Sequence, residues 1–134
     1  MEVDSVFGPI DISISGLRAQ SKQIEVVSSN VANARTTDAG NGEPYRRLEA
    51  LFKADDEGIC GVSLEKIAED MSEFSKVFDP GNPHADDQGY VAMPNVNLPT
   101  EIMNLTIATR AYQANAAILK RYQQMVETAL ELLR

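Results

Sequence analysis

Apolar residues recur every seven positions along the last part of the chain. The main row consists of Leu98, Leu105, Tyr112, Leu119, Val126 and Leu133. A second row, four residues beyond the first, consists of Ile102, Ala116 and Leu130. Such heptad spacing is typical of a helix that packs one face against another helix. Pro99 suits the first turn of that helix, and either Asn97 or Thr100 could cap it. The pattern therefore predicts one long helix over residues 98–134.

A weaker heptad row opens the chain, at Ile10, Leu17, Ile24 and Val31. Gly16 and several serines lower helix propensity there, but the spacing still predicts a helix over residues 10–34. At 1.5 Å per residue, the two helices would span roughly 37 and 55 Å. A compact domain of this length has a radius of gyration of only about 14 Å. The longer helix should therefore project, and its apolar stripe can be covered either by a helical hairpin or by self-association.

The middle of the chain loses the helical period. Residues 36–44 are rich in turn formers, and residues 45–54 have the composition of a strand. Residues 62–68 fit a strand or a helix, and a strand is preferred because it would pair with 45–54. Residues 80–97, with three Pro and three Asn, are predicted to form an extended arm without a regular element.

The predicted fold class is mainly α with a small β insert. It divides the chain into an N-terminal helical segment 1–35, a small β-containing middle domain 36–79, an extended arm 80–97 and a C-terminal helical segment 98–134. The two helical segments are predicted to pair.

Charge follows the same division. The chain has 134 residues, enough for one domain, with 12 Lys+Arg against 20 Asp+Glu and a net charge of −8. Residues 35–97 hold 13 acids and 6 bases, so the acidity is concentrated in the middle while both ends are almost neutral. Nearly neutral ends suit packed surfaces, because an unpaired charge is costly to bury. The acidic balance argues against nucleic-acid binding. We expect no direct membrane insertion and no cleavable signal peptide.

Candidate chemistry is sparse. His84 lies near Asp79, Asp86 and Asp87, but their spacing matches no standard metal-ligand motif, and a solvated loop histidine is the preferred interpretation. The single Cys60 excludes an intrachain disulfide and favours a small buried apolar role. No nucleotide-binding loop or nucleophile motif appears. We therefore predict no catalytic, cofactor-binding or metal-binding residues, and a hydrolase using Asp79, His84 and Asp86 is a remote alternative.

Several separated blocks of the sequence match one family pattern. Residues 11–20 lead into an Asn-Ala-Asn-like stretch at 30–37, followed by a Pro-Tyr-Arg-Arg block, a Pro/Asn-rich block over 78–97 and a helical block over 101–119. Their motif residues are Asn30, Asn33, Pro44, Tyr45, Arg46, Pro80, Pro83, Arg110 and Asn115. In this order, the blocks resemble the bacterial flagellar rod and hook proteins. The middle blocks are similar to the proximal rod proteins in particular.

The resemblance implies a non-enzymatic structural subunit, without cofactors, of the flagellar basal body. Such subunits are exported by the flagellar type III apparatus and polymerise helically into the rod, the drive shaft that crosses the periplasm. It also implies that the terminal helices pair as an α-helical coiled coil. The expected partners are further copies, other proximal and distal rod proteins and the adaptor that joins the rod to the MS ring. A secreted helical adaptor that pairs with a partner helix without polymerising is the alternative.

Within that family fold we expect an assembly seam at the heptad positions. Its residues are Leu17, Ile24, Val31, Leu98, Leu105, Tyr112, Leu119 and Val126. Asn30, Asn33 and Asn115 could form caps and turns or inter-subunit hydrogen bonds, with the local role preferred. Arg110 is a candidate for an inter-subunit salt bridge, although a solvated arginine is equally compatible with the sequence.

Overall fold

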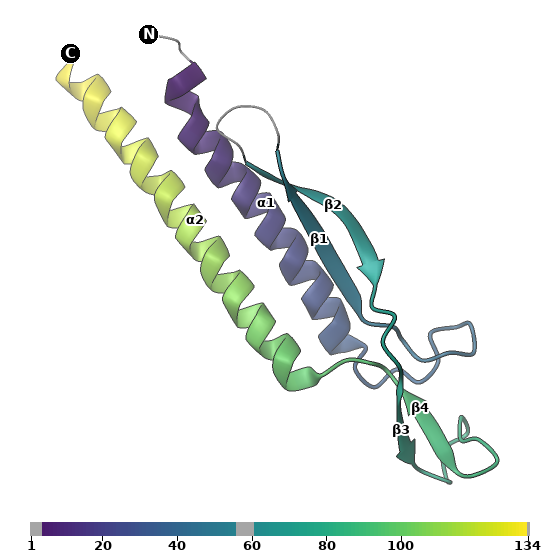
Figure 1. Cartoon of the computed structure of the whole chain (residues 1–134). Coiled ribbons are helices and arrows are strands. Elements are labelled where there is room, and N and C mark those ends of the chain that lie inside the picture. Colours follow the sequence, from purple (N-terminus) through teal and green to yellow (C-terminus); the bar gives the residue numbers. More distant parts are fainter. Residues whose placement is uncertain (1–3, 56–60, 134) are drawn as a thin grey trace.

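Two antiparallel helices and two short hairpins make up the elongated fold (Figure 1). The computed structural model describes residues 4–55 and 61–133. Its elements are α1 (Asp4–Ala32), β1 (Leu48–Ala54), β2 (Val62–Glu69), β3 (Ser75–Phe78), β4 (Tyr90–Met93) and α2 (Leu98–Leu132). Helix α1 is the middle layer, with α2 on one side and the β1–β2 hairpin on the other. The β3–β4 hairpin extends past the end of the helical layers, away from the C-terminal end of α2.

The first hairpin confirms the preferred interpretation of residues 62–68. Strand β2 pairs antiparallel with β1, from Leu48 opposite Glu69 to Ala54 opposite Val62, with a register shift between Leu51 and Phe52. Ala19 of α1 lines a groove together with Val62 and Leu64 of β2, so this hairpin packs one side on α1.

The second hairpin corrects the expectation of an arm without a regular element over residues 80–97. Residues 90–93 form β4, which pairs antiparallel with β3. The turn closes because Gly89 adopts a positive φ of 82°, which glycine tolerates, and because the Asp86 carboxylate accepts the backbone N–H groups of Gln88 and Tyr90. Frequent Pro and Asn predicted a loop correctly up to this turn, but masked the four-residue strand that follows it.

The hydrophobic core is narrow. Apart from Pro44 and Pro94, the buried apolar side chains of the described residues are those of Ala19, Val26, Val27, Val91 and Ala108. Three polar side chains are buried as well, those of Ser13, Asn30 and Glu101. Neither helix, as described, is long and apolar enough to cross a membrane. With so little apolar burial, the polar contacts take on a large share of fixing the fold.

The predicted helix boundaries agree closely with the structure for α2 and less closely for α1. Helix α2 begins at Leu98 as predicted, with Pro99 in its first turn, and Asn97 is the N-cap whose Oδ1 accepts the Thr100 backbone N–H at 3.1 Å. Helix α1 begins at Asp4 and includes Pro9, whereas the prediction started at residue 10. The apolar repeat starts only at Ile10, so periodicity carried no signal for the preceding turns.

Within one copy, the helices meet along a different row from the predicted seam. The buried residues of α2 are Glu101 and Ala108, whereas the heptad residues Leu98, Tyr112 and Val126 are 38–40% exposed. An α-helix has 3.6 residues per turn, so a strict seven-residue row drifts by about 20° per heptad around a straight helix. The other predicted seam residues, Leu17, Ile24, Val31, Leu105 and Leu119, are half-buried. The assembly seam itself stays a prediction.

The two helices approach each other closely at Gly16. A Cβ atom added there would lie 2.7 Å from Nδ2 of Asn115, whereas one added at Gly8 of the same helix would meet nothing within 4 Å. Gly16→Leu is therefore expected to lower the free energy of unfolding by about 1–3 kcal/mol through overpacking. Gly8→Leu is expected to raise it by roughly 0.5 kcal/mol, because leucine forms helices better than glycine.

Urea unfolding followed by circular dichroism at the helical band measures both changes. Equal stability of the two variants would show that the helices do not pack closely at Gly16 in solution.

Candidate assembly surface and its polar junction

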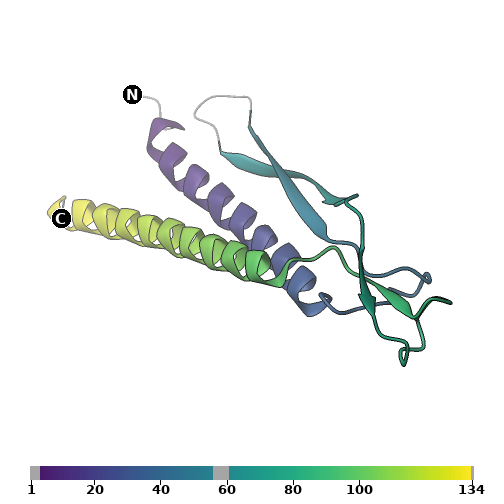
Figure 2. The same ribbon diagram turned by 60° about the horizontal axis from the view of Figure 1, so that its bottom comes forward.

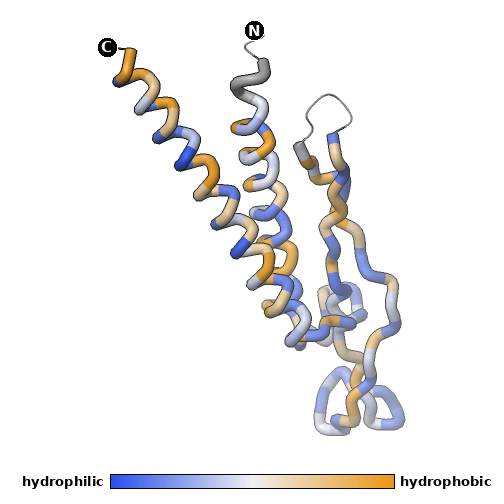
Figure 3. Tube along the Cα trace, turned by 60° about the vertical axis from the view of Figure 1, so that its left-hand side comes forward, coloured by the Kyte–Doolittle hydropathy of each residue, from blue (hydrophilic) through white to orange (hydrophobic). Residues whose placement is uncertain are grey.

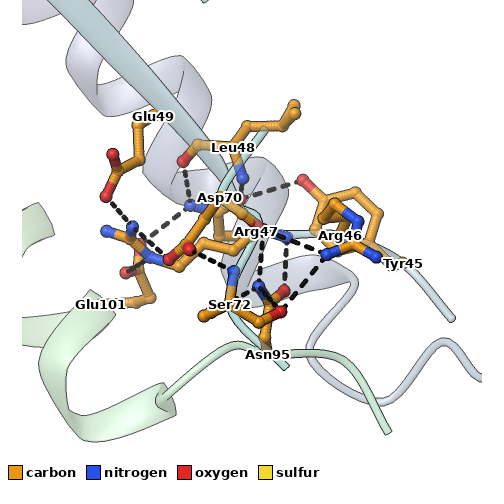
Figure 4. Close-up of polar contacts among 10 residues, drawn as sticks. Tyr45, Arg46, Arg47, Leu48, Glu49, Asp70, Ser72, Asn95 and Glu101 are labelled. Carbon is orange, nitrogen blue, oxygen red and sulfur yellow. Dashed lines mark hydrogen bonds and ion pairs between the residues drawn. The ribbon is translucent and has the colours of Figure 1, made fainter. Parts of the chain in front are cut away.

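A buried polar junction ties both helices to the β insert (Figure 4). Its centre is Glu101, in the first turn of α2, whose side chain is only 1% exposed. The Nε of Arg47 donates to one carboxylate oxygen of Glu101 at 2.7 Å. The Nδ2 of Asn30, near the end of α1, donates to the other at 3.1 Å. The end of α1, the segment before β1 and the first turn of α2 thus meet at one carboxylate, although they are far apart in sequence.

Asn30 acts as an additional backbone partner for the start of β1. It is fully buried, its Nδ2 donates to the Leu48 carbonyl at 2.9 Å, and its Oδ1 accepts the Leu48 N–H at 2.9 Å. The hydroxyl of Tyr45 also donates to Oδ1 at 3.0 Å. These hydrogen bonds fix the position of the start of β1 relative to the end of α1. The amide of Asn30 therefore makes its hydrogen bonds within one copy of the chain.

A second asparagine joins the two hairpins. Asn95, between β4 and α2, accepts the Arg47 backbone N–H at 2.8 Å. Its Nδ2 donates to the Asp70 carbonyl at 2.8 Å and to the Ser72 hydroxyl at 2.9 Å. The neighbouring Arg46 donates to the carbonyls of the same two residues and stacks on the ring of Phe74, 4.2 Å from its centroid. The link between β2 and β3 is thereby held against the segment that leads into β1.

One guanidinium, that of Arg47, pairs with three carboxylates at the junction. Burial by itself would lower the pKa of Arg47, but hydrogen bonds to Glu101 and Glu49, with the charges of both, raise it above its ordinary value. The backbone N–H and hydroxyl of Ser72, followed by the charge of Arg47, hold the pKa of Asp70 below its usual range. Every buried side-chain nitrogen and oxygen in the described ranges has a hydrogen-bond partner. The junction is thus a satisfied network that positions elements.

Sequence reasoning singled out only part of this junction. Asn30, Tyr45 and Arg46 were chosen as motif residues, whereas Glu101, Arg47 and Asn95 were not assigned a role. The sequence did contain one signal for Glu101. It is the only acidic residue between positions 98 and 126, in a segment whose apolar pattern predicts a packed helix.

The remaining motif residues lie outside the junction's centre. Pro44 is buried, just before Tyr45. Asn33 donates to the Ser29 carbonyl at 2.9 Å and accepts the Thr36 hydroxyl at 3.2 Å, so it organises the turn after α1. Asn115 packs on Gly16.

Four further candidates are exposed: Pro80, Pro83, His84 and Arg110. His84 donates its backbone N–H to Asn82 and lies in the loop of the β3–β4 hairpin. In the described part of the chain, no cluster of three His, Cys, Asp or Glu residues could hold a metal ion. Cys60 lies outside the described residues.

Exposed apolar side chains recur along one side of α2. We call this side the open face of α2. Its residues are Met103, Ile107, Ile118, Met125 and Leu132, each more than half exposed and related by helical spacing. Figure 3 shows hydrophobic residues continuing along α2 to its C-terminal end, where the two helices draw apart. Large apolar residues gathered on one exposed side of an element mark an interaction site.

Comparison with known proteins places these elements in one family. The family model described as flagella basal body rod protein matches residues 10–39, which include most of α1. The model described as flagellar basal body rod FlgEFG protein C-terminal matches residues 87–132, which include β4 and α2. The flagellar basal-body rod protein FlgC of Agrobacterium fabrum is 36% identical over 136 residues, covering 98% of both chains. The chain belongs to the FlgC family of flagellar basal-body rod proteins.

Two further FlgC relatives give the same assignment. The protein of Salmonella typhimurium is 39% identical over 125 residues, covering 91% of this chain and 93% of its own. That of Bacillus subtilis is 37% identical over 147 residues, covering 96% and 98%. As a member of the FlgC family, the chain is a structural subunit of the basal-body rod and not an enzyme. Its place is the flagellar basal body, among other rod components, and the non-polymerising adaptor has no support.

Proposed function

We propose that this chain polymerises helically through α1 and α2 and builds the proximal part of the rod, which transmits torque across the periplasm. The observation that carries this proposal is the open face of α2. Five apolar side chains on one side of the helix, each more than half exposed, have no cover within the described chain. Neighbouring subunits that cover this face remove it from water at every lattice contact.

The predicted assembly seam fits the same function. Its residues on α2 lie next to Glu101 and Ala108, the row of α2 that is buried within one copy. A helix from a neighbouring subunit could therefore complete the burial of the seam residues in a coiled-coil arrangement. Burying one aliphatic side chain contributes roughly 1.5–3 kcal/mol, so a few such residues per subunit suffice to drive assembly. Torque is then carried by many packed contacts at once.

The partners follow from the family. We infer that the chain contacts further copies, other proximal and distal rod proteins and the adaptor between rod and MS ring. Export through the flagellar type III apparatus agrees with the narrow core. The few buried apolar side chains of the described residues leave little apolar burial to lose when a subunit unfolds for passage.

Leu119→Asp tests the polymerisation proposal. Leu119 lies on the predicted seam and is half-buried in one copy, so a carboxylate there would have to be desolvated when a neighbouring helix packs on it. We expect cells that carry only this variant to lose motility and rod incorporation. Swimming in soft agar and the variant's presence in purified basal bodies are the measurements.

Gln124→Asp is the matched control. It introduces the same charge on the same helix at an exposed position outside the heptad rows, and it should leave motility intact. Val126→Asp repeats the test on a seam residue that is 38% exposed, where intrachain packing is disturbed less. Motile cells with normal rods that contain Leu119→Asp and Val126→Asp would contradict the proposal.

A further inference from the structure

The β3–β4 hairpin presents a rigid aromatic surface at one end of the molecule. Phe78 and Tyr90 face each other edge to face, with ring centroids 5.3 Å apart. Nevertheless Phe78 is 62% exposed and Tyr90, directly opposite it in the hairpin, is 41% exposed. The turn beyond them is fixed by Asp86. This surface, the hairpin patch (Phe78 and Tyr90), is exposed yet ordered by its own contacts, so little ordering is needed before it binds a partner.

Acidic side chains border the hairpin patch. Asp79 directly follows β3, and Asp86 and Asp87 lie in the turn before β4. Hydrogen bonds from the backbone of Tyr90 and Gln88 hold the pKa of Asp86 below its usual range, so that its charge persists. Lys76 pairs with Asp86 at 3.8 Å. Within the described ranges, Asp79 and Asp87 have no ion-pair partner. The patch is thus apolar with a negative border.

The middle of α2 carries the opposite combination of apolar and charged residues. Arg110, Ala114, Ala117 and Arg121 follow one another at helical spacing, so they share one side of α2. Ile118 and Met125, 54% and 59% exposed, lie beside them. The two arginines are about 16 Å apart along the helix axis and have no ion-pair partner among the residues the structure describes. We call this surface the helix patch (Arg110, Ala114, Ala117, Ile118, Arg121 and Met125). It is apolar with a positive border.

We propose that the hairpin patch of one copy docks on the helix patch of a second copy of this chain. The apolar side chains would face one another, while Asp79 and Asp87 would approach Arg110 and Arg121. This inference rests on the proposed function, because it names one contact within the polymer.

The positions of the two patches favour a second copy over an internal contact. The hairpin extends past the N-terminal end of α2 (Figures 1 and 2), whereas the helix patch begins 12 residues, about 18 Å, further along the helix. A hairpin therefore cannot reach the helix patch of its own chain in this fold. A contact between unlike surfaces leaves a free surface of each kind on the assembly, so it builds an open filament and not a closed dimer.

A charge-swap experiment tests this pairing. Asp87→Arg and Arg121→Asp each replace an attraction by a repulsion at the proposed contact, and each changes an exposed side chain without a hydrogen bond among those described. We expect each single variant to reduce the incorporation of subunits into basal bodies at least about fivefold. The double variant, with both charges exchanged in every copy, should recover at least half of the wild-type incorporation. Urea unfolding of each variant checks that the monomer is unchanged.

The outcomes separate this contact from polymerisation in general. Normal incorporation of both single variants overturns the hairpin contact, whereas Leu119→Asp still reports on the proposed function. Loss in both single variants without recovery in the double variant also overturns it, since the two patches would then contact different rod proteins. Recovery only when both exchanges are present supports contact between copies of this chain.

Discussion

Replacing Arg47 with Ala is expected to lower the free energy of unfolding of this chain by about 3–5 kcal/mol. The variant removes the guanidinium that lies 2.7 Å from the carboxylate of Glu101, a side chain that is 1% exposed. The carboxylate would keep the amide of Asn30 as a donor, but it would have lost its charged partner while remaining out of contact with water. Urea unfolding at neutral pH, followed by far-ultraviolet circular dichroism, measures the change.

Lys22→Ala is the matched control for Arg47→Ala. It breaks a Lys22–Glu25 pair of the same length, 2.7 Å, but the two side chains are 48% and 66% exposed. Exposed pairs of this kind contribute about 0.2–1 kcal/mol, so the control should change stability little. A loss below 1 kcal/mol for Arg47→Ala would mean that Glu101 does not depend on this ion pair.

A double variant separates charge from packing. When Arg47→Met is combined with Glu101→Leu, both charges disappear and the apolar stems remain. Replacement of a whole buried ion pair by apolar side chains is often close to neutral, so most of the lost stability should return. If the double variant is as unstable as Arg47→Ala, the packing of the arginine stem and its hydrogen bonds to Glu49 and Asp70 account for the loss.

Asn30→Asp is expected to destabilise the chain by about 3 kcal/mol or more at neutral pH. Asn30 is fully buried, and its Nδ2 donates to both the Leu48 carbonyl and the carboxylate of Glu101. An aspartate oxygen in the place of Nδ2 would face two acceptors, one of them a carboxylate 3.1 Å away. Two donated hydrogen bonds are lost, and a like-charge repulsion is added.

The same substitution predicts the direction of a pH dependence. Repulsion from Glu101 raises the pKa of the introduced Asp carboxyl in the folded state above its value of about 3.9 in the unfolded chain. The folded state then binds more protons than the unfolded state between these two values, so stability falls as pH rises through that window. The deficit relative to the wild-type chain should therefore be smallest near pH 4 and largest at neutral pH.

Asn33→Asp is the control for this effect. It makes the same chemical change three residues further along, where the amide donates to the Ser29 carbonyl and, among the residues that the structure describes, to no carboxylate. Urea unfolding at several pH values compares the two variants. Equal, pH-independent losses in both would contradict a carboxylate repulsion at the junction.

The helical and strand elements were largely predictable because their signals are local. The heptad row beginning at Leu98, together with Asn97 and Pro99, located the start of α2. The apolar residues of 45–54 and 62–68 located the first hairpin. Strand β4 was missed because its four residues, after a Pro- and Asn-rich loop, are too few to show an alternating pattern. The turn at Gly89 is what brings them into pairing with β3.

The buried contacts were harder to predict than the elements. Which row of a helix faces its neighbour depends on crossing geometry, and the heptad pattern gave no indication that Glu101 and Ala108 would be buried ahead of Tyr112 and Val126. The junction was partly accessible, since Asn30 and Tyr45 were marked by family resemblance. The pairing of Arg47 with Glu101 joins residues 54 positions apart, and no spacing rule links them.

The junction fixes α2 near its N-terminal end, and the packing of Asn115 on Gly16 holds it again about halfway along. From Asn115 the helix runs for about 26 Å to Leu132. Rotation by about 5° at that contact would displace the C-terminal end by about 2 Å, because displacement grows with the length of the lever. A small adjustment where the helices touch therefore changes which residues of a neighbouring subunit the end of α2 can meet. The stiffness of the helix–helix contact and of the junction sets how faithfully every subunit repeats the same shape.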